Sequence, residues 1–126
     1  MNTQISGGLK ITFLLHFVVA LLFGLGFLLI PATMLSMYGL ELSGPTIYRL
    51  FGGALLGFSV SSWLGYRATT WESVRIVVIM EIFWAFLGAL IFAYGLLVDD
   101  FPALAWMNVA ILAAFGIAFT WFYTRR

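Results

Sequence analysis

Long apolar runs separated by short polar segments dominate the chain. The runs cover residues 10–30, 46–66, 76–98 and 103–123. About 20 apolar residues are needed for a helix to cross a hydrocarbon core roughly 30 Å thick. The polar segments are too short to form domains of their own. The pattern therefore predicts one all-α membrane domain, residues 1–126, in which four spans form an antiparallel four-helix bundle.

The segments outside these runs have distinct compositions. Residues 1–9 are polar and glycine-containing, which is typical of a frayed or interfacial terminus rather than a folded element. Residues 31–45 contain two prolines and two glycines with apolar residues between them, so we expect an interfacial segment with a short re-entrant or surface-lying helix. The sequence RATTWESVR at 67–75 is the most polar interior stretch and predicts a loop.

The second run contains a row of small residues, Gly53, Gly57, Ser61 and Gly65. Residues four apart lie on one face of a helix. Small side chains let membrane helices approach closely, and such contacts replace the hydrophobic driving force that lipid removes. We therefore expect this row to be the helix-packing face against which the other spans lie. The alternative is that it forms the interface of a homo-oligomer.

Composition excludes several classes of function. The chain is 63% hydrophobic and 9% charged, which no soluble domain of this size matches, and its partner is therefore the lipid bilayer. A net charge of +1 with no internal basic run gives no basis for nucleic-acid binding. With no cysteine and one histidine, we expect neither a disulfide nor a metal site. No nucleophile, phosphate-loop, haem or dinucleotide motif is present, so we assign no catalytic residue and no cofactor.

The distribution of basic residues predicts the orientation. If four spans cross the membrane, one side carries five of the six cationic residues, and Arg49 alone lies on the other. The five are Lys10, Arg67, Arg75, Arg125 and Arg126. Cytoplasmic segments are enriched in Lys and Arg, so both termini are expected to be cytoplasmic in a multi-pass protein of the cell (inner, cytoplasmic) membrane.

Two ionisable residues fall within the apolar runs, His16 and Glu81. Such residues are costly in a membrane and are candidates for function. Each lies about 9 Å along its helix from the nearest basic residue at the start of its span. Ser61, Ser62 and Thr120 fall at the same depth, which predicts one polar ligand-binding layer. The alternative is structural: a protonated Glu81, or one that extends toward Arg75, with His16 joining the helices.

A second candidate ligand site lies at the opposite end of the predicted bundle. Arg49 opens the second span there, and Asn108 is near the start of the fourth. The arginine fork suits a phosphate or carboxylate group. The alternative is an interfacial ion pair between Arg49 and one of the nearby acids, Glu41, Asp99 or Asp100.

Three short motifs occur in order: Pro31 at the end of the first span, MYGL at residues 37–40, and Arg49-Leu50-x-Gly52-Gly53 at the start of the second. In this arrangement the chain resembles small DoxX-like four-span membrane proteins of bacteria and archaea. The resemblance implies a possible association with quinones or with redox partner proteins. It carries over no catalytic residue, and the absence of cysteine argues against direct sulfur chemistry.

These observations leave two main hypotheses for function. The first is a non-enzymatic binding or accessory module for a hydrophobic, lipid-like small molecule, such as a quinone or lipid, or for a membrane partner protein. The second is a transporter or channel subunit that acts as a homo-oligomer. An enzyme that uses Glu81 and His16 as an acid and base is a third possibility.

Overall fold

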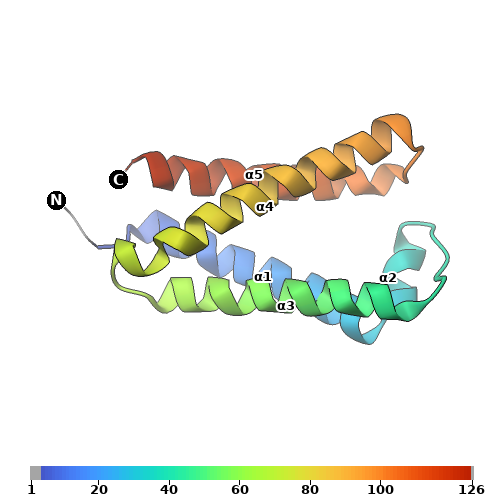
Figure 1. Cartoon of the computed structure of the whole chain (residues 1–126), viewed down its shortest axis with the longest axis horizontal. Coiled ribbons are helices and arrows are strands. Elements are labelled where there is room, and N and C mark those ends of the chain that lie inside the picture. The colour runs from blue at the N-terminus through green and yellow to red at the C-terminus, as the bar shows by residue number, and fades with distance from the viewer. Residues whose placement is uncertain (1–3, 126) are drawn as a thin grey trace.

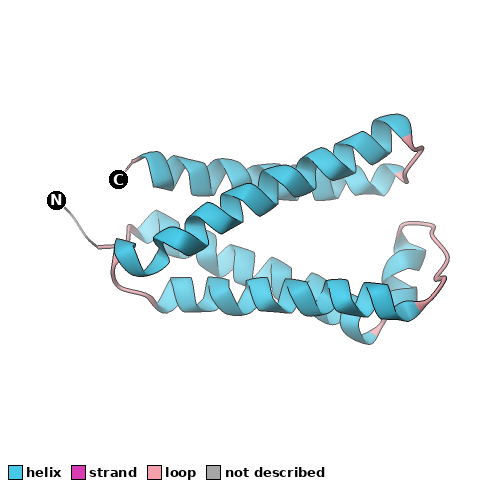
Figure 2. Cartoon of the chain, viewed as in Figure 1, coloured by secondary structure: helices cyan, strands magenta, loops and turns pink. Residues whose placement is uncertain are grey.

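The computed structural model describes residues 4–125 and is all-helical in that range. Figures 1 and 2 show its elements, which are listed here in chain order: α1 (Gly7–Leu29), α2 (Pro31–Met37), α3 (Pro45–Arg67), α4 (Trp71–Val98), the 3-10 turn η1 (Ala103–Ala105) and α5 (Trp106–Thr124). The all-α prediction is confirmed. The helix expected within 31–45 is α2, which Pro31 begins at the first helical position, where its missing N–H costs nothing.

Three helical segments are long and apolar enough to cross a membrane: α1, α4 and the continuous segment from η1 through α5. The remaining predicted span, the second in chain order (46–66), corresponds to α3, which has the same length as α1 but a lower hydropathy. Arg49 and Arg67, one near each end of α3, and the serines Ser59, Ser61 and Ser62 all lower its hydropathy. Three apolar membrane-type helices are therefore present, and the spanning of α3 stays a prediction.

Two predicted segment assignments were wrong. Helix α4 begins at Trp71 rather than at 76, so the loop before it is confined to residues 68–70. Trp71 and Val74 are buried, and this burial extends the helix into the polar stretch. Residues 4–9 are not frayed: Ser6 accepts a hydrogen bond from the Leu9 N–H (3.1 Å) and caps α1, and Ile5 is buried. Residues 1–3 of that predicted terminus lie outside the described range.

The long helices form two pairs, α1 with α3 and α4 with α5. In Figure 1, α4 begins beside α1 and α3 at the end of the bundle where both chain termini lie, and it diverges from α3 toward the end that carries α2. We call these the terminal end and the α2 end. The two pairs are therefore close together at the terminal end and separated at the α2 end.

Two hydrophobic clusters explain this shape. The first cluster joins α1, α4 and α5 at the terminal end; it consists of Ile5, Leu9, Phe13, Trp71, Val74, Val78 and Phe119. The second joins α1, α2 and α3 at the α2 end; its buried members are Phe27, Met34, Leu35 and Leu55. The second cluster contains no buried residue from α4 or α5. The fully buried core therefore joins the two pairs at the terminal end, whereas the half-buried Trp84 is the α4 residue that packs against the second cluster.

Close packing of α1 and α3 uses a different glycine from the one expected. A Cβ on Gly52 would lie 2.5 Å from the backbone nitrogen of Leu28, and one on Gly65 would lie 2.7 Å from the Phe13 ring. Gly53 and Gly57 are exposed, and a Cβ on either would meet nothing within 4 Å. Of the three glycines in the predicted row, only Gly65 therefore packs closely against another described helix. The buried positions of α3 are spaced three or four residues apart. They therefore do not follow a row in which every spacing is four residues.

Candidate functional site

Three buried polar side chains from three helices meet between the helix pairs. His16 of α1 places Nε2 3.1 Å from Glu81 Oε2 of α4, and its Nδ1 lies 2.7 Å from Ser62 Oγ of α3. The Ser62 hydroxyl donates to Glu81 Oε1 at 3.5 Å. The exposed fractions of the three residues are 5%, 0% and 1%. His16, Ser62 and Glu81 thus form a closed ring of hydrogen bonds, which we call the polar triad.

The hydrogen-bond directions constrain the protonation of the triad. Because the Ser62 hydroxyl donates to Glu81, its oxygen accepts from Nδ1–H of His16. A proton between His16 Nε2 and Glu81 Oε2, either as an imidazolium–carboxylate pair or as a neutral imidazole with a carboxylic acid, would leave the triad without net charge. Such neutrality allows the group to be buried among apolar helices.

Aromatic rings of α5 complete the surroundings of His16. Phe115 lies edge-on to the imidazole with a centroid separation of 4.8 Å, and Phe119 does so at 5.8 Å. Helix α5 therefore contributes the edges of two apolar rings to this site, rather than the hydroxyl group expected from Thr120. The Thr120 hydroxyl is buried and has no partner among the described residues.

The other predicted site residues are divided between different environments. Ser61 is half-buried; its hydroxyl donates to the carbonyl of Phe58 in its own helix at 2.9 Å, and its side chain also interacts with the Glu81 carboxyl group. Arg49 is exposed and does not line the cavity described below. Within residues 4–125 it forms no ion pair, and the expected bridges to Glu41, Asp99 or Asp100 are absent there. Asn108 is the one member of the second candidate site that faces the space between the helix pairs.

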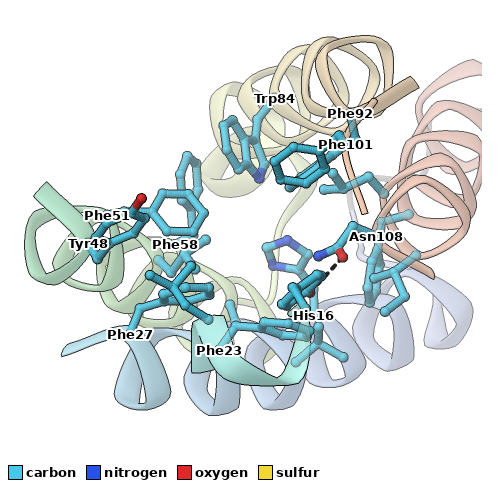
Figure 3. A pocket seen from close by; sticks show the side chains of 18 of the residues that line it. His16, Phe23, Phe27, Tyr48, Phe51, Phe58, Trp84, Phe92, Phe101 and Asn108 are labelled. Carbon is cyan, nitrogen blue, oxygen red and sulfur yellow. Dashed lines mark hydrogen bonds between the residues drawn. The ribbon is translucent and has the colours of Figure 1, made fainter. Parts of the chain in front are cut away.

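A cavity of about 410 Å³ occupies that space (Figure 3). Its volume is within the range of small-molecule sites, roughly 300–1,000 Å³. Ten of its twenty lining residues are Phe, Tyr or Trp, and no Lys, Arg, Asp or Glu is among them. His16 lines its wall, whereas Glu81 and Ser62 do not. The triad therefore lies behind His16 and presents only the imidazole to the cavity.

A hydrogen bond between α2 and α5 borders the cavity at the α2 end. The Tyr38 hydroxyl donates to Asn108 Oδ1 at 2.6 Å. Both residues line the cavity, as does Leu35 of α2. Burial raises the pKa of the Tyr38 phenol above its ordinary value, so the hydroxyl remains protonated and can donate at neutral pH. This hydrogen bond connects the end of α2 to α5, which contributes no residue to the second hydrophobic cluster.

Sequence reasoning missed most of the cavity wall. Phe23, Phe51, Phe58 and Trp84 line it, and Phe58 stacks on Trp84 with centroids 5.1 Å apart and an interplanar angle of 17°. Aromatic residues are common throughout this chain, at 18% of all positions, and periodicity alone cannot separate lipid-facing rings from cavity-facing ones.

No family model, curated protein or solved structure matches this chain.

Proposed function

We propose that this protein is a non-enzymatic membrane module that binds a hydrophobic, lipid-like small molecule in the cavity between its helix pairs. A quinone or a lipid is the class of ligand in view, and a membrane partner protein that supplies or receives it would fit the same role. The observation that carries the proposal is the apolar, aromatic-lined cavity of about 410 Å³. A soluble polar substrate would lose its hydration there and gain few polar partners.

The arrangement of the chain in the bilayer is part of the proposal. Four spans, α1, α3, α4 and α5, cross the cell membrane, with both termini cytoplasmic. Two facts support the crossing of α3: it is about 34 Å long by its 23 residues, and it packs along α1 over much of its length. The surplus of basic residues at the terminal end supports the orientation. The cavity would then lie in the outer half of the membrane.

The polar triad has a structural role in this proposal. Both ring nitrogens of His16 have partners, Ser62 and Glu81, so neither is free to bind a ligand or to abstract a proton from one. The triad joins α1, α3 and α4 behind the inner end of the cavity. This arrangement favours a binding module over an enzyme that uses Glu81 and His16 as acid and base.

A transporter or channel subunit is the second candidate. Its support is the exposed face of α3 at Gly53 and Gly57, which another copy of the chain could cover. Against it, a conducting path requires polar groups at several depths, and the cavity wall is predominantly apolar. We therefore rank it below the binding module.

A cavity-filling substitution tests the proposed function. Ile111→Trp adds a bulky ring to the cavity wall, whereas Ile117→Trp places the same ring on an exposed face of the same helix. Both variants and the natural chain would be extracted from their own membrane and analysed by native mass spectrometry. We expect a bound hydrophobic molecule on the natural chain and on Ile117→Trp, and a reduced amount on Ile111→Trp. A bare natural chain, or equal occupancy in both variants, would contradict the proposal.

A further inference from the structure

Two hydrogen-bond donors face the cavity without an acceptor among the described residues. Asn108 accepts the Tyr38 hydroxyl through Oδ1, and no described residue accepts a hydrogen bond from its Nδ2. The indole Nε1–H of Trp84 likewise has no acceptor within residues 4–125. Figure 3 shows the nitrogen atoms of both side chains directed into the cavity, from α5 and from α4.

The positions of both donors are set by their neighbours. Trp84 stacks on Phe58 across the contact between α4 and α3. The Tyr38 hydroxyl, at 2.6 Å, holds Oδ1 of Asn108 and so leaves Nδ2 on the cavity side. A donor that is fixed in an apolar cavity and has no acceptor loses free energy unless a bound molecule supplies one. Two such donors in one wall indicate the polar chemistry of the occupant.

The rest of the wall limits the occupant further. No charged Lys, Arg, Asp or Glu side chain lines the cavity, so a carboxylate, phosphate or ammonium group would be buried without a counter-ion. His16 cannot accept a hydrogen bond from a ligand, because both of its nitrogens are engaged. The aromatic rings of the wall favour edge-on and offset contacts with flat rings.

We propose that the cavity selects neutral, ring-containing molecules whose polar atoms are carbonyl-type acceptors, which Asn108 Nδ2 and Trp84 Nε1 bind. The inference rests on the proposed function, namely that the cavity holds a hydrophobic small molecule. It adds the chemistry by which the ligand is recognised. The ligand accepts hydrogen bonds from the wall, does not need to donate any, and carries no charge.

Two probes with one skeleton test this selection. 9-Fluorenone and fluorene are flat, neutral three-ring molecules that differ in a carbonyl replacing a methylene group. Binding would be measured by equilibrium dialysis against the full chain in nanodiscs, with empty nanodiscs subtracted. We expect the natural chain to bind fluorenone about 5- to 100-fold more tightly than fluorene, the range that one or two net hydrogen bonds supply. The infrared C=O stretch of bound fluorenone should shift to lower frequency.

Three variants assign the preference to the donors. Trp84→Phe keeps a ring against Phe58 but removes the N–H, and Asn108→Leu removes the amide at similar size. Each should reduce the fluorenone preference by about 2- to 10-fold while fluorene binding is retained. Tyr38→Phe separates the positioning of the amide from its presence, because it releases Asn108 Oδ1 but leaves Nδ2 in the cavity wall. Its fluorenone preference should fall by less than that of Asn108→Leu.

The outcomes separate this inference from the proposed function. Equal binding of the two probes, or a preference unaffected by both Trp84→Phe and Asn108→Leu, would overturn the carbonyl selection while leaving a hydrophobic site. A preference that falls in Tyr38→Phe by as much as in Asn108→Leu would also overturn the direct role of Nδ2. Binding of neither probe above empty nanodiscs, together with no co-purifying molecule, would overturn both.

Discussion

Nε2 of His16 lies 3.1 Å from Oε2 of Glu81, with both side chains buried between helices α1 and α4. Removing one partner leaves the other buried and unsatisfied, which for buried ionic pairs costs about 3–5 kcal/mol. We predict that His16→Leu and Glu81→Leu each lower the free energy of unfolding by an amount of that order. The double variant should be destabilised by less than the sum, because no orphaned partner remains. Reversible denaturation in mixed micelles measures the cycle, and additive effects would show that the pair does not couple.

Ser62 and Ser61 are adjacent in sequence but differ in their contacts. Ser62→Ala removes the partner of His16 Nδ1 and leaves that buried N–H unsatisfied, so we expect a loss of about 1–3 kcal/mol. Ser61→Ala removes a bond to a carbonyl of the same helix and a secondary interaction with Glu81, and we expect a smaller loss, of at most about 1 kcal/mol. The same unfolding measurement compares the two variants. Equal losses would mean that Ser62 is not the residue that joins the helices.

The two glycine faces of α3 provide a third prediction. A Cβ at Gly52 would collide with the backbone of α1, so Gly52→Ala should destabilise the chain by about 1–3 kcal/mol or more. Gly57→Ala meets open space and replaces a poor helix former, so it should be neutral or stabilising by up to about 1 kcal/mol. Thermal unfolding of the monomer measures both. If Gly57→Ala instead dissociates a larger species on native electrophoresis, the exposed face packs against another copy.

The absence of cysteine permits a direct test of topology. Single substitutions Ser43→Cys and Thr69→Cys place a thiol before and after α3, at exposed positions. In intact cells a membrane-impermeant maleimide should label Ser43→Cys and leave Thr69→Cys unlabelled until the cells are lysed. Asp100→Cys, in the turn between α4 and η1, should behave like Ser43→Cys. Labelling of positions 43 and 69 from the same side would contradict the crossing of α3.

Much of the architecture follows from sequence pattern alone. The length of each apolar run predicts an apolar helix, because backbone groups must be satisfied internally in lipid. The positions of His16, Ser62 and Glu81 within their runs also predicted that they lie at one depth, because the rise per residue of a helix is constant. The start of α4 could not be predicted from the pattern. Trp71 and Val74 are buried, but they lie among polar residues at 71–75 and so resemble a loop in sequence.

The sequence by itself determined the helical class, the apolar runs and the level at which polar residues meet, since these depend on local hydropathy and on regular helical rise. Only the tertiary structure decided which face of α3 packs. Gly52 rather than Gly53 contacts α1, because that choice depends on the rotation of one helix against another. It also decided that the helix pairs diverge at the α2 end and enclose a cavity there, with the donors of Trp84 and Asn108 facing inward. A cavity forms where the surfaces of packed helices do not meet, and the local pattern of residues does not predict where this happens.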